Sequence, residues 1–375
     1  MTDGMLRARG PLAALALLGA LACTGRSDRG TRDSAAAGES AAGAAGAAGA
    51  AGAASAATAA GARVYVSNED GNSVTVIDAA TDSVVGTIQP GQRPRGVKVS
   101  PDGSLLVVAV SGSPKGGPGV DESKLPPPDR SKDGIALVDL ATGAVKGRLQ
   151  GGHDPESFAI TPDGKTIYVS NEDAGTATVL DLATGKMLAT VTVGSEPEGV
   201  TTSPDGKEVW VTSEGKGVVS VIDVGTNKVI ATIPSGRRPR SVVFTPDGAK
   251  AYIPAEVGGN VTVADARTHR VLKTIPIESP GARPMGSAIS PDGKRVYITN
   301  GRGGTVSVID VGTDSVVADF KVGTRPWGIA ITDDGRKIYT ANGPSNDVSV
   351  IDAATNRVVK RVPAGKSPWG VTIAK

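Results

Sequence analysis

Short stretches of alternating apolar and polar residues, separated by tight turns, recur along residues 63–375. The clearest copy is residues 290–310, where Ser-Pro-Asp-Gly leads into Arg-Val-Tyr-Ile-Thr, and a glycine-rich loop leads into Thr-Val-Ser-Val-Ile-Asp. Apolar side chains at every second position predict β-strands. Pro-Asp-Gly is typical of a turn because proline fixes φ and glycine accepts positive φ. We therefore predict an all-β fold of short strands joined by tight turns.

The unit occurs seven times. Each copy contains a strand that ends in aspartate, followed three residues later by threonine in every copy. A period in the forties built only from strands is typical of four-stranded β-propeller blades. The Asp-x-x-Thr segments are interpreted as Asx-type turns with a structural role. The seven aspartates are Asp78, Asp139, Asp181, Asp223, Asp265, Asp310 and Asp352.

The chain enters this repeat in the middle of a unit. The second, third and fourth strands are predicted at 64–67, 74–78 and 84–88 before any first strand has occurred, and the chain ends on a first strand at 370–374. We predict that this C-terminal strand completes the N-terminal blade. The result is a seven-bladed β-propeller over residues 63–375, closed into a ring without exposed sheet edges.

The N-terminus has the features of a signal sequence that is removed during processing. In residues 1–22, Arg7 and Arg9 precede an apolar run too short to span a bilayer, and this run ends at Cys23, the only cysteine. Ala-Leu-Ala-Cys at 20–23 resembles a bacterial lipobox, which implies a lipidated Cys23 and a periplasmic, outer-membrane lipoprotein. An ordinary secretory signal is the alternative. Residues 23–62, rich in Ala and Gly, predict a flexible tether.

Loops on one face of the propeller carry most of the sequence variation. Because successive strands run in opposite directions, the loops between blades share a face with the loops after each second strand, and we predict function there. The turns that enter the first strands form an acidic sector flanked by arginines, with an aromatic sector opposite. Surface ion pairs without a function are the alternative. The predicted ligand- or partner-binding residues are Arg93, Arg95, Asp154, Glu156, Glu196, Glu198, Arg238, Arg240, Trp327 and Trp369.

Two further features belong to the same face. Residues 112–135 form a long, proline-rich insert that could be a lid, a docking arm or a plain surface loop. Carboxylates after the second strands could hold Ca²⁺, but their spacing matches no calcium loop, and we predict no metal site. These carboxylates are Glu69, Asp70, Glu172, Asp173, Glu214 and Glu256.

Catalytic signals are weak. His153 stands beside Asp154 on the variable face, whereas His269 is expected in an exposed turn of the opposite face. No haem-attachment motif, nucleophile elbow or phosphate-binding loop is present. A net charge of +2 without a basic block argues against nucleic-acid binding. We expect a binding protein rather than an enzyme.

The repeat resembles the YVTN family of seven-bladed β-propellers over residues 63–375, through Tyr-Val-Ser-Asn at 65–68 and 168–171 and Tyr-Ile-Thr-Asn at 297–300. The insert, residues 154–158 and residues 170–175 are similar to propellers associated with PQQ-dependent catabolism. That resemblance implies an accessory role in a quinoprotein alcohol oxidation system and names no activity.

Together these features suggest a monomeric periplasmic binding or scaffold module, held at the membrane only by an N-terminal lipid. It would bind a protein partner or a small carboxylate ligand such as PQQ. The carboxylates would be attracted by arginines and the planar group would stack on Trp327 and Trp369. The arginines are Arg93, Arg95, Arg238 and Arg240. The alternative is a lactonase-type propeller that hydrolyses a small lactone at the channel mouth.

Overall fold

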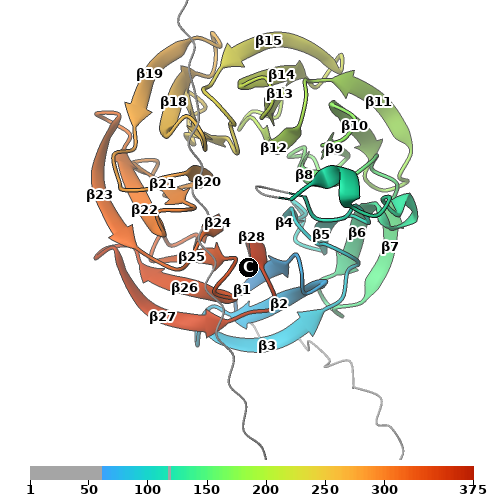
Figure 1. The fold of residues 1–375 in the computed structure, drawn as a ribbon, viewed down its shortest axis with the longest axis horizontal. Helices are drawn as coiled ribbons and strands as arrows, with labels where there is room; N and C mark the ends of the chain where they lie inside the picture. The colour runs from blue at the N-terminus through green and yellow to red at the C-terminus, as the bar shows by residue number, and fades with distance from the viewer. Residues whose placement is uncertain (1–60, 117–119) are drawn as a thin grey trace, which may run out of the picture. The chain divides into compact units, whose positions relative to one another are not determined.

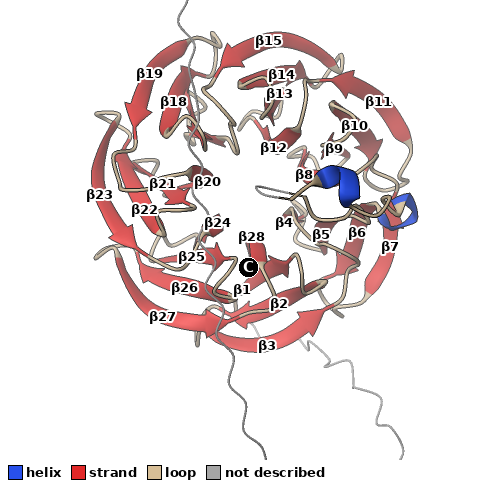
Figure 2. Cartoon of the chain, viewed as in Figure 1, coloured by secondary structure: helices blue, strands red, loops and turns tan. Residues whose placement is uncertain are grey.

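A computed structural model describes residues 61–116 and 120–375. The predicted signal segment, Cys23 and nearly all of the predicted tether lie outside the described residues. The described part contains 28 strands and two short 3-10 helices, η1 (Glu122–Lys124) and η2 (Arg130–Lys132). Figure 2 shows that both helices belong to the insert. None of the helices in this part is long and apolar enough to cross a membrane.

The strands form seven four-stranded antiparallel sheets, which are arranged as blades around a central opening (Figure 1). The predicted seven-bladed propeller is confirmed. From blade 1 to blade 7 the innermost strands are β28 (Pro368–Ala374), β4 (Val97–Val99), β8 (Pro155–Ile160), β12 (Pro197–Thr202), β16 (Val243–Phe244), β20 (Pro284–Ile289) and β24 (Pro326–Ile331).

The remaining three strands of each blade follow from the centre outward. The second strands are β1 (Arg63–Asn68), β5 (Leu105–Val110), β9 (Thr166–Asn171), β13 (Glu208–Ser213), β17 (Lys250–Ala255), β21 (Arg295–Asn300) and β25 (Lys337–Asn342). The third strands are β2 (Ser73–Asp78), β6 (Gly134–Asp139), β10 (Thr176–Asp181), β14 (Val218–Asp223), β18 (Asn260–Asp265), β22 (Thr305–Asp310) and β26 (Asp347–Asp352). The outer strands are β3 (Ser83–Ile88), β7 (Val145–Leu149), β11 (Met187–Thr192), β15 (Lys228–Pro234), β19 (Val271–Pro276), β23 (Ser315–Lys321) and β27 (Arg357–Pro363).

The ring closes as predicted. The C-terminal strand β28 pairs antiparallel with β1, with Arg63 opposite Ala374 and Val66 opposite Val371. Blade 1 is therefore built from both ends of the propeller sequence, in the order β28-β1-β2-β3. Closure gives the innermost and second strands of this blade the same pairing as in the other blades, so no sheet is left incomplete.

Hydrophobic cores lie between neighbouring blades. The core between blades 1 and 2, for example, combines Tyr65 and Val76 with Leu106, Val108 and Ala136. Because each blade packs between two others, the second and third strands are buried on both faces, and even polar residues such as Ser67 are buried. The outer strands are largely exposed.

Hydrogen bonds show that the repeated Asp-x-x-Thr and Tyr-Val-Ser-Asn motifs have structural roles. The Asp78 carboxylate accepts bonds from the backbone N–H of Thr81 at 2.8 Å and from its hydroxyl at 3.0 Å, as predicted for an Asx-type turn. In the Tyr-Val-Ser-Asn motif, the Asn68 amide donates to the hydroxyls of Ser73 and Thr75 on the adjacent strand, at 3.1 and 2.9 Å.

Two tyrosines of the second strands connect successive blades. The Tyr168 hydroxyl donates to the Asn227 side chain of the next blade at 2.6 Å, and Tyr339 donates in the same way to Asp82 at 2.7 Å. Both acceptors have a positive φ, of 54° and 51°. Each tyrosine thereby ties the second strand of one blade to the outer turn of the next.

Blade 4 is connected to blade 5 by different side chains. Trp210 replaces the tyrosine and donates to Glu208 at 2.9 Å, and Glu208 lies 2.9 Å from the His269 ring of blade 5. The rings of Trp210 and His269 meet edge to face, 5.9 Å apart. The expectation that His269 is solvent-exposed is wrong, since its side chain is only 17% exposed. Its role in this contact is structural.

Candidate functional site

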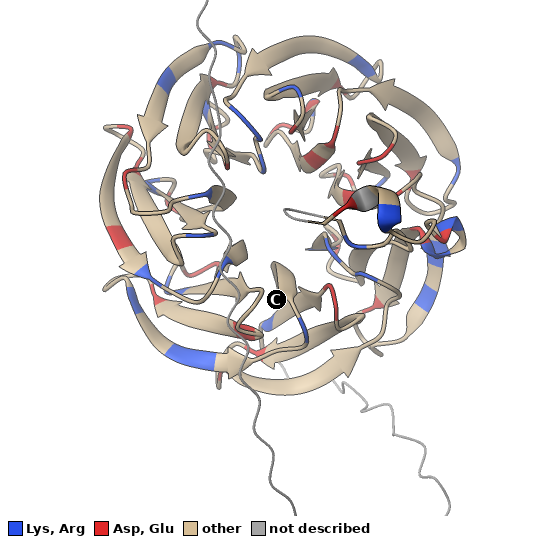
Figure 3. Cartoon of the chain, viewed as in Figure 1, with Lys and Arg blue, Asp and Glu red and all other residues tan. Residues whose placement is uncertain are grey.

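All ten residues predicted to bind a ligand or partner line one cavity of about 1560 Å³. We call this cavity the mouth. It opens on the face formed by the loops between blades and the loops after the second strands, and Figure 3 shows acidic and basic residues on the loops around the central opening. The predicted gathering of these loops around a single opening is therefore present.

The turns that enter the innermost strands have an unusual backbone. In six of the seven turns, the residue before the proline is not glycine and has a positive φ of 41° to 57°. This conformation is uncommon for residues with a side chain, and it recurs here next to the mouth. Each turn places the side chains before and after its proline at the rim of the mouth. The six residues are Arg93, Asp154, Glu196, Arg238, Arg325 and Ser367.

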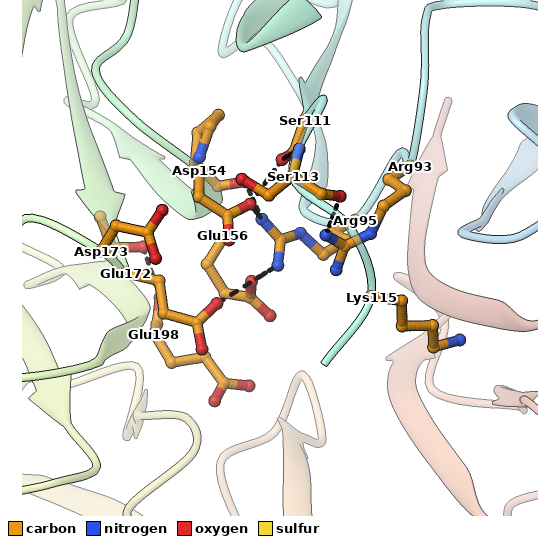
Figure 4. A network of polar contacts seen from close by, with 12 residues as sticks. Arg93, Arg95, Ser111, Ser113, Lys115, Asp154, Glu156, Glu172, Asp173 and Glu198 are labelled. Atoms are coloured by element: carbon orange, nitrogen blue, oxygen red, sulfur yellow. Dashed lines mark hydrogen bonds and ion pairs between the residues drawn. The ribbon is translucent and has the colours of Figure 1, made fainter. Parts of the chain in front are cut away.

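One wall of the mouth is built around Arg95, which is only 2% exposed. Its guanidinium pairs with Asp154 and Glu156, and lies 3.5 Å from Glu172. Figure 4 shows the carboxylates of Asp154 and Glu156 pointing toward Arg95. Three carboxylates from blade 3 thus share one arginine from blade 2.

A second buried arginine, Arg240, repeats this arrangement three blades further on, in blade 5. Its guanidinium pairs with Glu198 at 2.6 Å, with Glu214, and with Glu256 at 3.7 Å. Arg238 also pairs with Glu214. Both arginines are held in place by carboxylates of the protein itself.

The arginines were expected to attract the carboxylates of a ligand, and the structure gives them internal partners instead. Besides Arg95, Arg238 and Arg240, Arg93 pairs with Glu69 at 2.8 Å. The alternative of simple surface ion pairs does not fit Arg95 and Arg240 either, because these two are buried with their partners. The four arginines chiefly neutralise the acidic wall.

The carboxylates of the acidic wall are only partly neutralised, because they outnumber the arginines that pair with them. Burial raises the pKa of Glu198 to about 7; Arg240 opposes the rise, while the nearby charges of Glu172 and Glu256 add to it. Burial likewise raises the pKa of Glu156 well above its usual range, against the effect of Arg95. Near neutral pH Glu198 can hold or release a proton, and burial favours the protonated form of Glu156.

Glu69 is different because it has more cations around it. Burial favours its protonated form, but the charges of Arg93, Arg95 and Lys115 outweigh burial and lower its pKa. Glu69 is therefore a carboxylate at neutral pH. The mouth contains firmly ionised acids and readily protonated acids side by side.

The opposite wall is aromatic, as predicted. The rings of Trp327 and Trp369 are 5.5 Å apart and tilted by 41° to each other. The guanidinium groups of Arg240 and Arg325 lie 5.0 and 5.1 Å from the centre of the Trp327 ring, within range of cation–π attraction. Within the described residues, Arg325 has no carboxylate at ion-pair distance, and it is not one of the ten site residues predicted from the sequence.

The insert forms part of the mouth. Pro126, Pro127 and Pro128 line the cavity. Lys115 pairs with Glu69 of blade 1 at 2.9 Å, and Arg130 pairs with Asp173 of blade 3 at 2.5 Å. The insert of blade 2 is thus attached to both neighbouring blades, which excludes a plain surface loop that is remote from the site.

Carboxylates that follow the second strands were considered for Ca²⁺, and five of them line the mouth as partners of its arginines. Over residues 61–116 and 120–375, no group of three or more His, Cys, Asp or Glu side chains is arranged to hold a metal ion. The five carboxylates are Glu69, Glu172, Asp173, Glu214 and Glu256.

Comparisons with known families match parts of the chain. The family described as "Lactonase, 7-bladed beta-propeller" matches residues 192–365, and the "Cytochrome D1 heme domain" family matches residues 129–242. The chain is a seven-bladed β-propeller, and parts of it are similar to lactonase and haem d1 propeller domains. No curated protein matches the chain.

Solved structures with the same fold are distant in sequence. Hydrazine synthase of Kuenenia stuttgartiensis is 23% identical, with 75% of this chain and 89% of that chain covered and a TM-score of 0.62. A functionally unknown protein from Desulfotomaculum acetoxidans DSM 771 is 16% identical, with 83% and 98% covered and a TM-score of 0.68. The dihydro-haem d1 dehydrogenase NirN, in complex with DHE, is 18% identical, with 83% and 74% covered and a TM-score of 0.57.

The mouth does not fit a haem held by an axial protein ligand. Haem iron is usually bound by His, Cys, Met or Tyr, and none of these lines the mouth in the part of the chain that the structure describes. His153, the only histidine near this face, is exposed and is not among the lining residues.

Proposed function

We propose that the mouth is a binding site for a small ligand with a planar, largely apolar part. One observation carries this proposal: Trp327 and Trp369 form an aromatic wall in the same cavity as a buried, arginine-neutralised acidic wall. Ligand pockets commonly combine an apolar contact surface with a few fixed polar groups that orient the ligand. A cavity is better suited to a small molecule or a short segment than to a flat protein interface.

The acidic wall limits what the ligand can be. Its two buried arginines are committed to internal carboxylates, and Glu198 and Glu156 can donate hydrogen bonds when protonated. The ligand therefore presents neutral polar groups or hydrogen-bond acceptors to this wall. A tricarboxylate such as PQQ would have to displace internal ion pairs, so we expect PQQ to bind more weakly than a neutral planar compound of similar area.

Tryptophan fluorescence of the full chain tests this proposal with 2-naphthamide as the probe. We expect saturable quenching, and Trp369→Ala should weaken binding about tenfold, because a stacked ring contributes on the order of 1 kcal/mol beyond its burial. Trp210→Phe is the matched control, since Trp210 is buried against His269 and lies outside the mouth. Binding that is absent, or equally strong in Trp369→Ala, contradicts the proposal.

Lactone hydrolysis is the second candidate, favoured by the family match over residues 192–365, which includes Glu198 and its partner Arg240. In this reaction water adds to the carbonyl carbon, the ring C–O bond breaks, and the leaving alkoxide takes a proton. A carboxyl with a pKa of about 7 can supply that proton at neutral pH.

A panel of small lactones incubated with the full chain decides between binding and hydrolysis. The hydrolytic function predicts turnover that Glu198→Gln abolishes and that Glu278→Gln, a change at an exposed glutamate outside the cavity lining, leaves intact. Absence of turnover, or turnover that survives Glu198→Gln, removes this candidate.

We further propose that the module works in the periplasm, tethered through a lipidated Cys23, as an accessory of a quinoprotein oxidation system. This proposal is supported by the lipobox-like residues 20–23 and by the resemblance of the insert. Metabolic labelling with a fatty acid, lost in Cys23→Ser, tests the tether. Release of unlabelled protein from cells would contradict it.

A further inference from the structure

A second, smaller cavity of about 310 Å³ lies among the innermost strands. It shares four lining residues with the mouth, namely Glu198, Arg240, Trp327 and Trp369. The two spaces are therefore adjacent parts of one site, and we call the smaller one the channel.

Lys98 on β4 is a lining residue of the channel that departs from the repeat. Six other innermost strands have a counterpart at the same position, and each counterpart is small or apolar and uncharged. A lysine here is not needed to build an innermost strand. The six counterparts are Ala159, Thr201, Val243, Ala288, Ala330 and Thr372.

The Lys98 ammonium group has no acidic partner. Its Nζ donates to the backbone carbonyl of Val200 at 3.0 Å, so the side chain reaches from blade 2 past blade 3 to blade 4. Across the described residues, no carboxylate lies at ion-pair distance from it, in contrast to Arg95 and Arg240 in the mouth. The hydroxyl of Ser157, which also lines the channel, makes no hydrogen bond within the described part either.

The Lys98 side chain is half-buried, and an ammonium group held partly away from water without a counter-ion is unfavourable. Desolvation lowers the pKa of Lys98 to about 8. At pH 7 the group is still protonated in about nine molecules of ten. A bound anion would restore the missing counter-charge. Glu198 borders the channel but is readily protonated near neutral pH, so it does not oppose an anion as strongly as an ordinary carboxylate would.

We propose that the channel is an anion subsite, in which Lys98 binds the carboxylate or another oxyanion of a ligand whose planar part lies against Trp327 and Trp369. The inference rests on the proposed function of the mouth and names its ligand class: a planar aromatic compound with one terminal anionic group. The anion enters the channel, and the ring stays in the mouth.

Paired probes test the subsite in the full chain, namely 2-naphthoate and the neutral 2-naphthamide. We expect the wild type to bind 2-naphthoate about tenfold more tightly than the amide. Lys98→Met should remove this preference and leave the affinity for 2-naphthamide unchanged, whereas Lys98→Arg should keep it. Arg325 is present in every variant, so a preference that survives Lys98→Met belongs to the rim and overturns the proposal.

The result separates the two proposals. If both probes bind the wild type equally, the anion subsite is wrong and the planar binding site stands. If neither probe binds, the proposed function fails, and the subsite is then decided with inorganic phosphate on protein whose lysines carry ¹³C-methyl groups. A saturable shift of the resonance that is missing in Lys98→Met supports the subsite, and an unshifted resonance overturns it.

Discussion

Two buried arginines, each facing three carboxylates, determine the electrostatics of the mouth. The carboxylates outnumber the arginines in both groups, even with Arg238 counted beside Arg240, so at least one acid in each group is better protonated than ionised. Around Arg240 that acid is Glu198, and around Arg95 it is Glu156. The positions that bind these protons follow from the ratio of charges and from burial.

Glu198→Gln should stabilise the protein at alkaline pH and not at acidic pH. Because the folded pKa of Glu198 is raised to about 7, the folded state keeps a proton that the unfolded chain loses above about pH 4.5. Stability from this group is thus present at low pH and is lost as the pH rises toward 7. Glutamine does not ionise, so the variant should gain on the order of 1–3 kcal/mol at pH 8 relative to wild type.

Thermal melts of both proteins at pH 5 and pH 8 check this expectation. Arg240 retains Glu214 and Glu256 in the variant, so its charge remains compensated. Glu278→Gln, at an exposed site, should show no pH-dependent difference. A variant that melts below wild type at pH 8 would mean that Glu198 is ionised and needed by Arg240.

For single residues, the sequence predicted which side chains lie together in the mouth, but it did not predict their ion pairs or protonation. The ten mouth residues could be selected because the turns recur at a known place in each blade. The pairing of Arg95 and Arg240 with internal acids could not be predicted from the sequence, because it depends on side chains from different blades that converge within a few ångströms. Lys98 was missed because a strand pattern does not show that an inward side chain lacks a counter-ion.

The insert is the element that changes a regular propeller into one with a deep mouth. Its attachments run to both neighbouring blades, through Lys115 and Arg130. Three successive prolines restrict the backbone of the segment that lines the cavity, which lowers the entropy lost when a ligand is enclosed.

Removing both attachments, in Lys115→Ala with Arg130→Ala, should weaken binding of 2-naphthamide without lowering the melting temperature. Lys115 is about half exposed, and pairs of this kind contribute roughly 0–1 kcal/mol each, so we expect a loss of about two- to fivefold. The loss should shrink as salt is raised from roughly 0.05 to 0.5 M, because salt screens the wild-type pairs.

Lys124→Ala serves as the control, since the one ion pair of Lys124 among the described residues is with Asp121 inside the insert. Equal affinity of the double variant and wild type at low salt would show that the insert does not shape the site. The sequence located this element correctly from its length. Its course across two blades depends on tertiary contacts that strand periodicity does not encode.

Ring closure governs the molecule as a whole. Deleting residues 370–375 removes the partner of β1 from Val66 to Arg63 and opens blade 1 to solvent. We expect the melting temperature to fall by more than about 10 °C, because several kcal/mol of strand pairing and interblade packing are lost. Circular dichroism during heating measures the change.

Deleting Lys375 alone is the matched control, because within residues 61–116 and 120–375 its amine pairs with the exposed Asp333 and with no other carboxylate. That deletion should shift the melting temperature by less than about 1 °C. An unchanged melting temperature after the longer deletion would refute the closure. The fold could be predicted because seven copies of each strand type are countable along the chain, with β28 as the one out of sequence order.

The pairing of Arg63 with Ala374 also determines on which face a label or a fusion partner can be attached to the propeller. The first strand begins, and the last strand ends, on the face of the Pro-Asp-Gly turns, opposite the mouth. A fluorescent protein fused after Lys375, or a biotin placed there for capture on a sensor surface, would project away from the cavity. Immobilised protein should therefore present its binding site to the solution, and a carrier joined at this end should not obstruct ligand entry.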